Sequence, residues 1–141
     1  MSQAPNNSDP AEASATVEET TTFTPKFDDK GLIPAIVIDQ QTNDVAMFAW
    51  MNQEALTATQ KTGVAHFWSR SRKKIWCKGE ESGNLLWVQK LRTDCDQDCI
   101  VVNAIVEGDG VACHTKRKTC FYRELGPIAQ DRYVKLSFAV T

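Results

Sequence analysis

Apolar runs separated by polar turns dominate the chain from residue 32 onward. Residues 33–38 and 45–50 flank the turn-forming residues 41–44, a pattern that predicts a β-hairpin. Further apolar runs predict strands at residues 64–69, 75–78, 85–92, 100–106 and 119–123, and one more around 133–140. The hydrophobic pattern therefore predicts an α+β fold that is predominantly β.

One short segment between these strands has the signals of a helix. Asn52 is a favourable N-cap, Glu54 suits the first turn, Leu56 belongs to an apolar side, and Gly63 is a stop signal. With 141 residues and 42% apolar content, the chain has enough material for one core and not for two. We therefore expect a small single domain with one short helix.

Composition divides the chain into three parts. Residues 1–27 are rich in Ser, Thr, Ala, Pro and Glu and lack a hydrophobic period, which predicts a disordered N-terminal tail. The folded domain is expected at residues 28–125, and residues 126–141 form a C-terminal extension.

Charge and targeting signals narrow the class of protein. A net charge of −2 gives no general argument for binding nucleic acid or a membrane surface. No apolar run approaches the roughly 20 residues that span a bilayer, and no export signal precedes the domain. We expect a cytoplasmic protein with no nucleic-acid or membrane partner. In such a protein, five cysteines favour reduced thiols or metal thiolates over disulfides.

An acidic segment at residues 94–98 suggests a metal site. If the segment is extended, the side chains of Asp94, Asp96 and Asp98 lie on one face, and Cys95 and Cys99 on the other. Three neighbouring carboxylates repel one another, and all-oxygen ligands favour Mg²⁺ or Ca²⁺. The alternative is a solvated acidic strand end.

This segment is not an EF-hand loop. Its sixth position is Cys99 where an EF-hand requires glycine, and its twelfth is Ile105 where an EF-hand requires glutamate.

The cysteines are not spaced as in zinc fingers, because 17 residues separate Cys95 from Cys113 and 6 separate Cys113 from Cys120. Three thiolates would leave zinc an open coordination position, as catalytic sites do. Cys99 would lie about 13 Å from Cys95 along a strand, too far to share the metal unless the strand breaks. Cys77 has the surroundings of a buried apolar cysteine.

His114 adjoins Cys113 and is one of two histidines in the chain. Its position beside a candidate metal ligand favours a catalytic proton carrier over a structural role. The other histidine, His66, lies in an apolar strand, where packing is at least as good an explanation as function.

Basic residues are concentrated at 69–74, where Arg70 and Arg72 would share one face and suit phosphate oxygens. A second basic cluster, residues 116–118, lies between two of the cysteines. A phosphorylated ligand accounts for both clusters, and a solvated hairpin tip is the alternative for the first.

Taken together, these segments resemble the phosphoribosyl-AMP cyclohydrolase family of histidine biosynthesis, in its monofunctional form. The resemblance rests on residues 31–36, 49–52, 66–72, 78–80, 82–83, 94–98, 112–115 and 119–122. It implies a hydrolase that opens the adenine ring of 1-(5-phosphoribosyl)-AMP at the N1–C6 bond. The product is an imidazole carboxamide that carries both phosphoribosyl groups.

The resemblance also implies an intertwined homodimer with two kinds of metal site. Zn²⁺ is expected on Cys95, Cys113 and Cys120 at a site shared between the subunits, and Mg²⁺ on Asp94, Asp96 and Asp98. Substrate contacts are expected from Trp68, Ser69, Arg70, Ser71, Arg72, Lys78, Glu80 and Ser82. We hypothesise that His114 accepts a proton from water activated by the zinc.

The sequence departs from the family pattern at three places. Asn84 stands where the family often has histidine, and Cys77 stands where it often has a basic residue. The loop at 107–111 is slightly longer than in the family pattern. Two other classes of protein fit the sequence less well. A zinc-dependent nucleobase deaminase would carry H-x-E followed by P-C-x-x-C, which is missing. A zinc module that binds nucleic acid would need paired cysteines and a basic balance, and the chain has neither.

Overall fold

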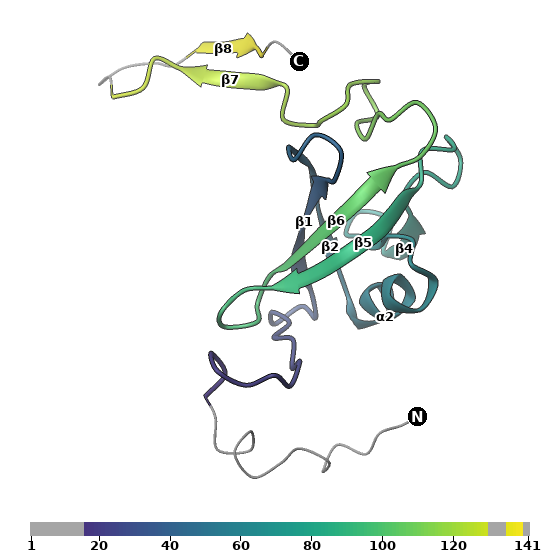
Figure 1. Cartoon of the computed structure of the whole chain (residues 1–141), viewed down its shortest axis with the longest axis vertical. Coiled ribbons are helices and arrows are strands. Elements are labelled where there is room, and N and C mark those ends of the chain that lie inside the picture. The colour runs from purple at the N-terminus through teal and green to yellow at the C-terminus, as the bar shows by residue number, and fades with distance from the viewer. Residues whose placement is uncertain (1–15, 130–134, 140–141) are drawn as a thin grey trace.

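The computed structural model describes residues 16–129 and 135–139. That part of the chain contains eight strands and one helix (Figure 1). In chain order the elements are β1 (Ile33–Asp39), β2 (Val45–Met51), α2 (Gln53–Thr62), β3 (His66–Ser69), β4 (Lys74–Cys77), β5 (Leu86–Thr93), β6 (Ile100–Val106), β7 (Arg123–Gly126) and β8 (Lys135–Phe138). The prediction of a small, predominantly β domain with one short helix is confirmed.

Six of the strands form one sheet in the order β4-β3-β2-β1-β6-β5. The predicted hairpin is present, because β1 and β2 pair antiparallel with Ile36 opposite Phe48. β6 pairs with β1 in parallel, and β5 pairs antiparallel with β6. This order separates the β3–β4 hairpin from the β5–β6 hairpin by the two central strands β1 and β2.

The core lies between one face of this sheet and the helix. Alternate residues of β1, beginning with Ile33, are fully buried, and Leu56 of α2 belongs to the same cluster. The predicted helix ends are confirmed: the Asn52 side chain accepts a 2.8 Å hydrogen bond from the Ala55 N–H, and Gly63 ends the helix at φ 75°. No helix in the described ranges is long and apolar enough to cross a membrane.

The strand expected at residues 119–123 is wrong. β7 begins only at Arg123, and the preceding residues attach to the start of β2 by isolated hydrogen bonds. The Thr119 hydroxyl donates to the Val45 carbonyl at 2.6 Å, and the Cys120 N–H donates to the Ala46 carbonyl at 2.8 Å. These bonds use the backbone and side chain alternately, so no ladder forms. Of the strand expected around 133–140, residues 135–138 form β8, and residues 133, 134 and 140 lie outside the described ranges.

The described end of the N-terminal segment lies against the loop between β5 and β6. Residues 1–15, most of the expected tail, are outside the described part. The Gln97 side chain accepts a 2.6 Å hydrogen bond from the Thr24 N–H and donates to the Thr22 carbonyl at 3.2 Å. The Gln97 carbonyl accepts from the Lys26 N–H at 2.7 Å. The fold therefore includes contacts made by residues that precede 28.

Candidate functional site

The acidic segment is a turn between β5 and β6, and the expectation of an extended segment is wrong. β5 ends at Thr93, and Gln97 adopts a left-handed backbone at φ 61°. The Asp94 carboxylate accepts hydrogen bonds from the backbone N–H groups of Asp98 and Cys99 at 3.0 and 3.1 Å. A carboxylate that bonds to the backbone a few residues on favours a turn over a strand.

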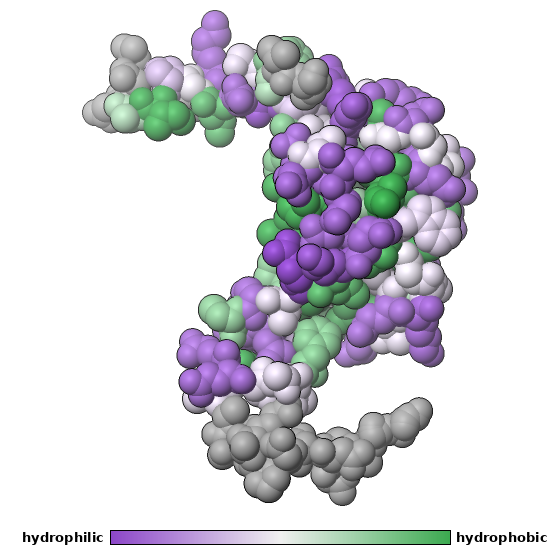
Figure 2. All heavy atoms as spheres, in the orientation of Figure 1, coloured by the Kyte–Doolittle hydropathy of each residue, from purple (hydrophilic) through white to green (hydrophobic). Residues whose placement is uncertain are grey.

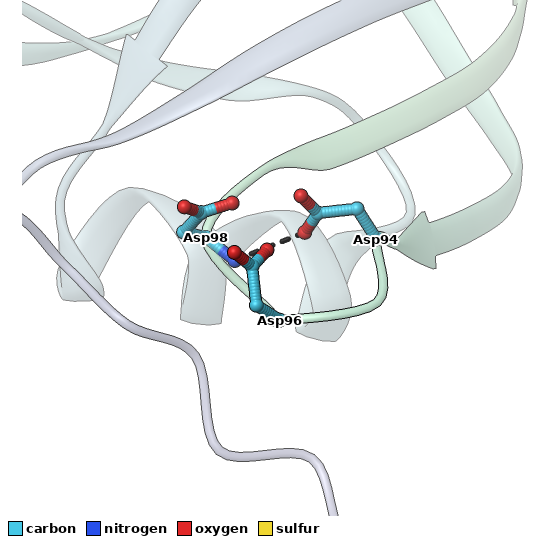
Figure 3. A group of neighbouring side chains, drawn as sticks. All are labelled: Asp94, Asp96 and Asp98. Carbon is cyan, nitrogen blue, oxygen red and sulfur yellow. Dashed lines mark hydrogen bonds between the residues drawn. The ribbon is translucent and has the colours of Figure 1, made fainter. Parts of the chain in front are cut away.

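The three carboxylates nevertheless converge, because the turn brings them together (Figure 3). Ligand oxygens of Asp94, Asp96 and Asp98 lie within 4.8 Å of one another, the only such group of three potential ligand residues in the described ranges. The pKa of Asp98 is raised to about 6, mainly by hydrogen bonds with the Asp94 and Asp96 carboxyls. Slight burial raises the pKa of Asp94, but hydrogen bonds from its two neighbours lower it overall. The cluster offers oxygen ligands of the kind that a hard cation prefers, and a bound cation would also relieve the repulsion between the carboxylates.

Cys113 and Cys120, which follow β6 in the chain, lie close enough together for each thiol to affect the pKa of the other. Burial raises the pKa of Cys113, but the Thr115 hydroxyl at 2.9 Å, the Thr115 N–H at 3.5 Å, the Cys120 thiol and the charge of Lys78 lower it overall. Burial and the neighbouring Cys113 raise the pKa of Cys120 to about 11. Cys113 is therefore the easier of the two thiols to deprotonate, and two neighbouring thiols suit a soft metal such as zinc, which binds them as thiolates.

Cys95 is not beside this pair within one chain. It precedes β6, whereas Cys113 follows β6, and a strand of seven residues is about 23 Å long. A single chain thus brings together two of the three predicted zinc ligands.

The other two cysteines differ from the pair. Strand geometry does not separate Cys99 from Cys95, because both residues lie in the turn between β5 and β6. The Cys99 thiol is half-buried and donates to the Ile100 carbonyl at 3.9 Å. Burial and the charges of Asp94 and Asp98 raise its pKa, which disfavours the thiolate that a metal needs. The pKa of Cys77 is likewise raised by burial and by Glu80.

The eight residues predicted to contact the substrate all line two neighbouring cavities. The first, of about 570 Å³, lies along β3 and its turn and is lined by Trp68, Ser69, Arg70, Ser71 and Arg72, among others. The second, of about 230 Å³, is lined by Arg72, Lys78, Glu80 and Ser82, among others.

Arg72 and Trp76 line both cavities, so the two hollows adjoin. The Arg70 guanidinium lies 5.1 Å from the centre of the Trp50 ring, a contact that orients its positive charge. The positive charge of Lys78 acts to lower the pKa of both Cys113 and Cys120. This residue of the second cavity therefore lies near the two thiols. The sequence elements 69–72 and 78–82 form one basic, polar surface next to the candidate zinc ligands.

The two histidines have different surroundings. His114 is exposed on a turn that the Lys116 N–H closes by donating to the Cys113 carbonyl at 3.0 Å. A ring nitrogen of His66 lies 2.8 Å from the Val64 carbonyl, and the backbone N–H of His66 donates to the Thr59 hydroxyl at 2.9 Å. These local bonds favour the structural interpretation of His66.

Sequence reasoning missed two residues that hold the loops in place. Gln97 fastens the N-terminal segment to the acidic turn. Asn84 is buried, its backbone lies directly against Gly79, and its side-chain oxygen accepts a hydrogen bond from the Asp109 N–H in the loop at 107–111. An amide side chain between Gly83 and an apolar strand was the available signal for Asn84, but its partners are distant in sequence.

Comparison with known proteins identifies the family of this chain. The family model for phosphoribosyl-AMP cyclohydrolase matches residues 47–122, more than half of the chain. A Brucella canis protein named phosphoribosyl-AMP cyclohydrolase is 56% identical over 109 residues, which cover 77% of this chain and 78% of the relative.

Two further relatives carry the same name. The Brucella anthropi protein is 52% identical over 121 residues, covering 86% of this chain and 84% of its own. The Sinorhizobium fredii protein is 50% identical over 117 residues, covering 83% and 77%. The matched region contains the acidic turn, the cysteine pair and both cavities. The chain therefore belongs to the phosphoribosyl-AMP cyclohydrolase family and is an enzyme of that family.

Proposed function

We propose that this chain hydrolyses the N1–C6 bond of the adenine ring in 1-(5-phosphoribosyl)-AMP, a step of histidine biosynthesis in the cytoplasm. One observation carries the proposal: all eight predicted substrate residues line two adjoining cavities, and one of them, Lys78, lies near Cys113 and Cys120. In the reaction, water supplies the oxygen of the new carboxamide at C6, and N1 takes a proton as the bond breaks.

The basic residues suit a ligand with two phosphates. Arg70 and Arg72 line the larger cavity, and Arg72 and Lys78 line the smaller one. Arginine presents a planar fork to phosphate oxygens, whereas lysine supplies a point charge. Each cavity therefore has at least one cation for a phosphoribosyl group, with the ring between them near the cysteines.

Zinc is proposed to bind Cys113 and Cys120 of one subunit and Cys95 of the partner subunit. The pair supports this because its two thiols influence each other's pKa at close range, and the lowered pKa of Cys113 favours the thiolate that a metal needs. The length of β6 supports the sharing, because it keeps Cys95 of the same chain away. When bound, zinc supplies a Lewis acid that makes water a better nucleophile near neutral pH.

Magnesium is proposed to bind Asp94, Asp96 and Asp98. Their carboxyl oxygens converge, and oxygen ligands suit this ion. Because Cys95 lies between Asp94 and Asp96, a homodimer that shares zinc would bring the acidic cluster of one subunit to the thiol pair of the other. There a cation would balance charge close to the phosphates.

His114 is proposed as the general base. Its exposed ring follows Cys113 directly and can take the proton of the attacking water at a ring nitrogen. The same ring can return that proton to N1 as the bond breaks. The turn that holds Cys113 thus also positions the base.

The proposal is tested with the purified protein, stripped of metal by a chelator and then supplied with zinc, with magnesium or with both. The substrate is phosphoribosyl-AMP, and the imidazole carboxamide product is followed by absorbance. We expect turnover only after zinc is restored. Ammonia release without ring opening would support a deaminase instead, and activity without any metal would overturn the zinc assignment.

A further inference from the structure

The N-terminal strap, which we define as residues 22–27, lies against the turn that carries the three aspartates. In Figure 1 this segment, drawn in purple, lies beside the loop that joins β5 to β6. The Thr24 N–H donates to the Gln97 side-chain oxygen at 2.6 Å, and the Gln97 side-chain amide donates to the Thr22 carbonyl at 3.2 Å. The Lys26 N–H donates to the Gln97 carbonyl at 2.7 Å. Gln97 therefore makes three hydrogen bonds to the backbone of the strap.

Gln97 is buried in the middle of an otherwise exposed turn. It is 4% exposed, whereas Asp94, Cys95 and Asp98 are exposed. A buried amide side chain needs a donor for its oxygen and an acceptor for its nitrogen. Both of these partners come from the strap. Gln97 can therefore stay in this position only while the strap is docked.

Apolar contacts hold the strap at two further points. Phe27 packs against the hydrophobic core. Phe23 lines a cavity of about 260 Å³ together with Thr93 and Ile100, among others, and these two residues flank the acidic turn. Figure 2 shows apolar atoms where the N-terminal segment meets the rest of the domain. The strap thus contacts the turn at Gln97 and also at the strand ends from which the turn projects.

These contacts bear on the aspartates because Gln97 lies between Asp96 and Asp98 in the chain. Its backbone is left-handed, at φ 61°, a conformation that residues other than glycine seldom adopt without support. The strap fixes both the side chain and the carbonyl of this residue, and so fixes the directions in which the chain enters and leaves it. Ligand oxygens of the three aspartates stay within 4.8 Å of one another in spite of their like charge. A site assembled before its ion arrives binds that ion more tightly.

We propose that the strap positions the acidic turn through Gln97 and thereby strengthens the binding of a divalent cation by Asp94, Asp96 and Asp98. The inference rests on the proposed magnesium site. It gives a positioning role to Gln97 and to the end of a segment that the sequence predicts to be a disordered tail. Such coupling is reciprocal, so a bound cation must stabilise docking of the strap by the same factor by which the strap strengthens binding.

A proline scan of one strap position tests the first half of this coupling in the full-length protein. Thr24→Pro removes the N–H that bonds to Gln97, whereas Thr24→Ala keeps that N–H and changes only an exposed side chain. Mn²⁺, which also takes oxygen ligands, is the probe, and free Mn²⁺ is measured by electron paramagnetic resonance. Thr24→Pro should raise the Mn²⁺ dissociation constant about fivefold, the effect of one hydrogen bond, and Thr24→Ala should match the wild type. Equal affinity in all three proteins, or an equal loss in both variants, would overturn the role of the strap.

Amide hydrogen exchange tests the other half on the unaltered chain. Saturating Mg²⁺ should slow exchange of the Thr24 and Lys26 N–H groups by about the same fivefold factor. The Gly31 N–H, which donates to the Asp28 carbonyl at 2.9 Å outside the strap, is the control and should not change. Strap amides that exchange equally with and without Mg²⁺, in a protein that binds Mn²⁺, would overturn the strap and leave the magnesium site standing. A wild-type protein that binds no Mn²⁺ would overturn the magnesium site, and this inference with it.

Discussion

The side-chain oxygen of Asn84 accepts a 2.9 Å hydrogen bond from the backbone N–H of Asp109, 25 residues away. Asn84 is buried at the end of the turn that carries Lys78, Glu80 and Ser82. This bond therefore ties the wall of the smaller cavity to the loop that leads to Cys113.

Asn84→Ala should lower the free energy of unfolding by about 1–3 kcal/mol, because the Asp109 N–H loses its acceptor. Urea denaturation measures this. Asp109→Ala is the control, since it keeps the backbone N–H and should stay near the wild-type value. If both variants lose the same stability, the hydrogen bond is not the cause.

Gly79 and Gly83 have similar left-handed backbones, at φ 89° and 85°, but different surroundings. A side chain at Gly79 would strike the backbone carbonyl of Asn84, whereas Gly83 faces open space. Gly83→Ala should cost about 1–2 kcal/mol of stability from backbone strain alone. Gly79→Ala should cost more, and it should also raise KM by displacing Lys78 and Glu80. Thermal unfolding and steady-state kinetics would show whether the two variants separate.

Cys113→Ala or Cys120→Ala should remove bound zinc and activity together, because each deletes one of three proposed ligands. Cys99→Ser should retain both, since the Cys99 thiol has a raised pKa and donates to the Ile100 carbonyl. Zinc is measured by mass spectrometry of the metal on the purified variants. Stoichiometric zinc in either of the first two variants would refute the assignment, and zinc loss in Cys99→Ser would indicate a fourth thiolate.

Cys95→Ala and Cys113→Ala should complement each other when the two variants are mixed and refolded. If the ligands come from opposite subunits, each heterodimer has one intact site and one that lacks both cysteines. About half of a statistical mixture is heterodimer, so about a quarter of wild-type activity should return. Confirmed heterodimers without activity would mean that each zinc site is built within one chain.

His114→Ala should keep zinc but lower kcat by about 10²–10⁴, the usual effect of losing a general base. His66→Ala is the comparison, because the His66 ring bonds locally to the Val64 carbonyl. That variant should change stability more than kcat. An unchanged pH–rate profile in His114→Ala would assign the proton transfer to another group.

Local sequence signals determined much of the fold. The helix from Asn52 to Gly63 and the hairpin of β1 and β2 were predictable because capping, alternation and turn residues act over a few positions. Most candidate site residues were likewise identifiable, since carboxylates, thiols and basic residues cluster in sequence as well as in space. The prediction of a strand at residues 119–123 was wrong because the hydrogen bonds of this segment go to β2, more than 70 residues away in the sequence.

Only the tertiary structure decided how these groups meet. The three aspartates converge because Asp94 closes a turn, and the alternation of a strand has no part in it. Cys95 is separated from Cys113 by the whole length of β6, a distance that spacing in sequence cannot express. The pairing of β7 with β8 likewise places Leu125 and Leu136 on one face. These relationships depend on register and on contacts between distant residues, which the order of amino acids encodes only through the whole fold.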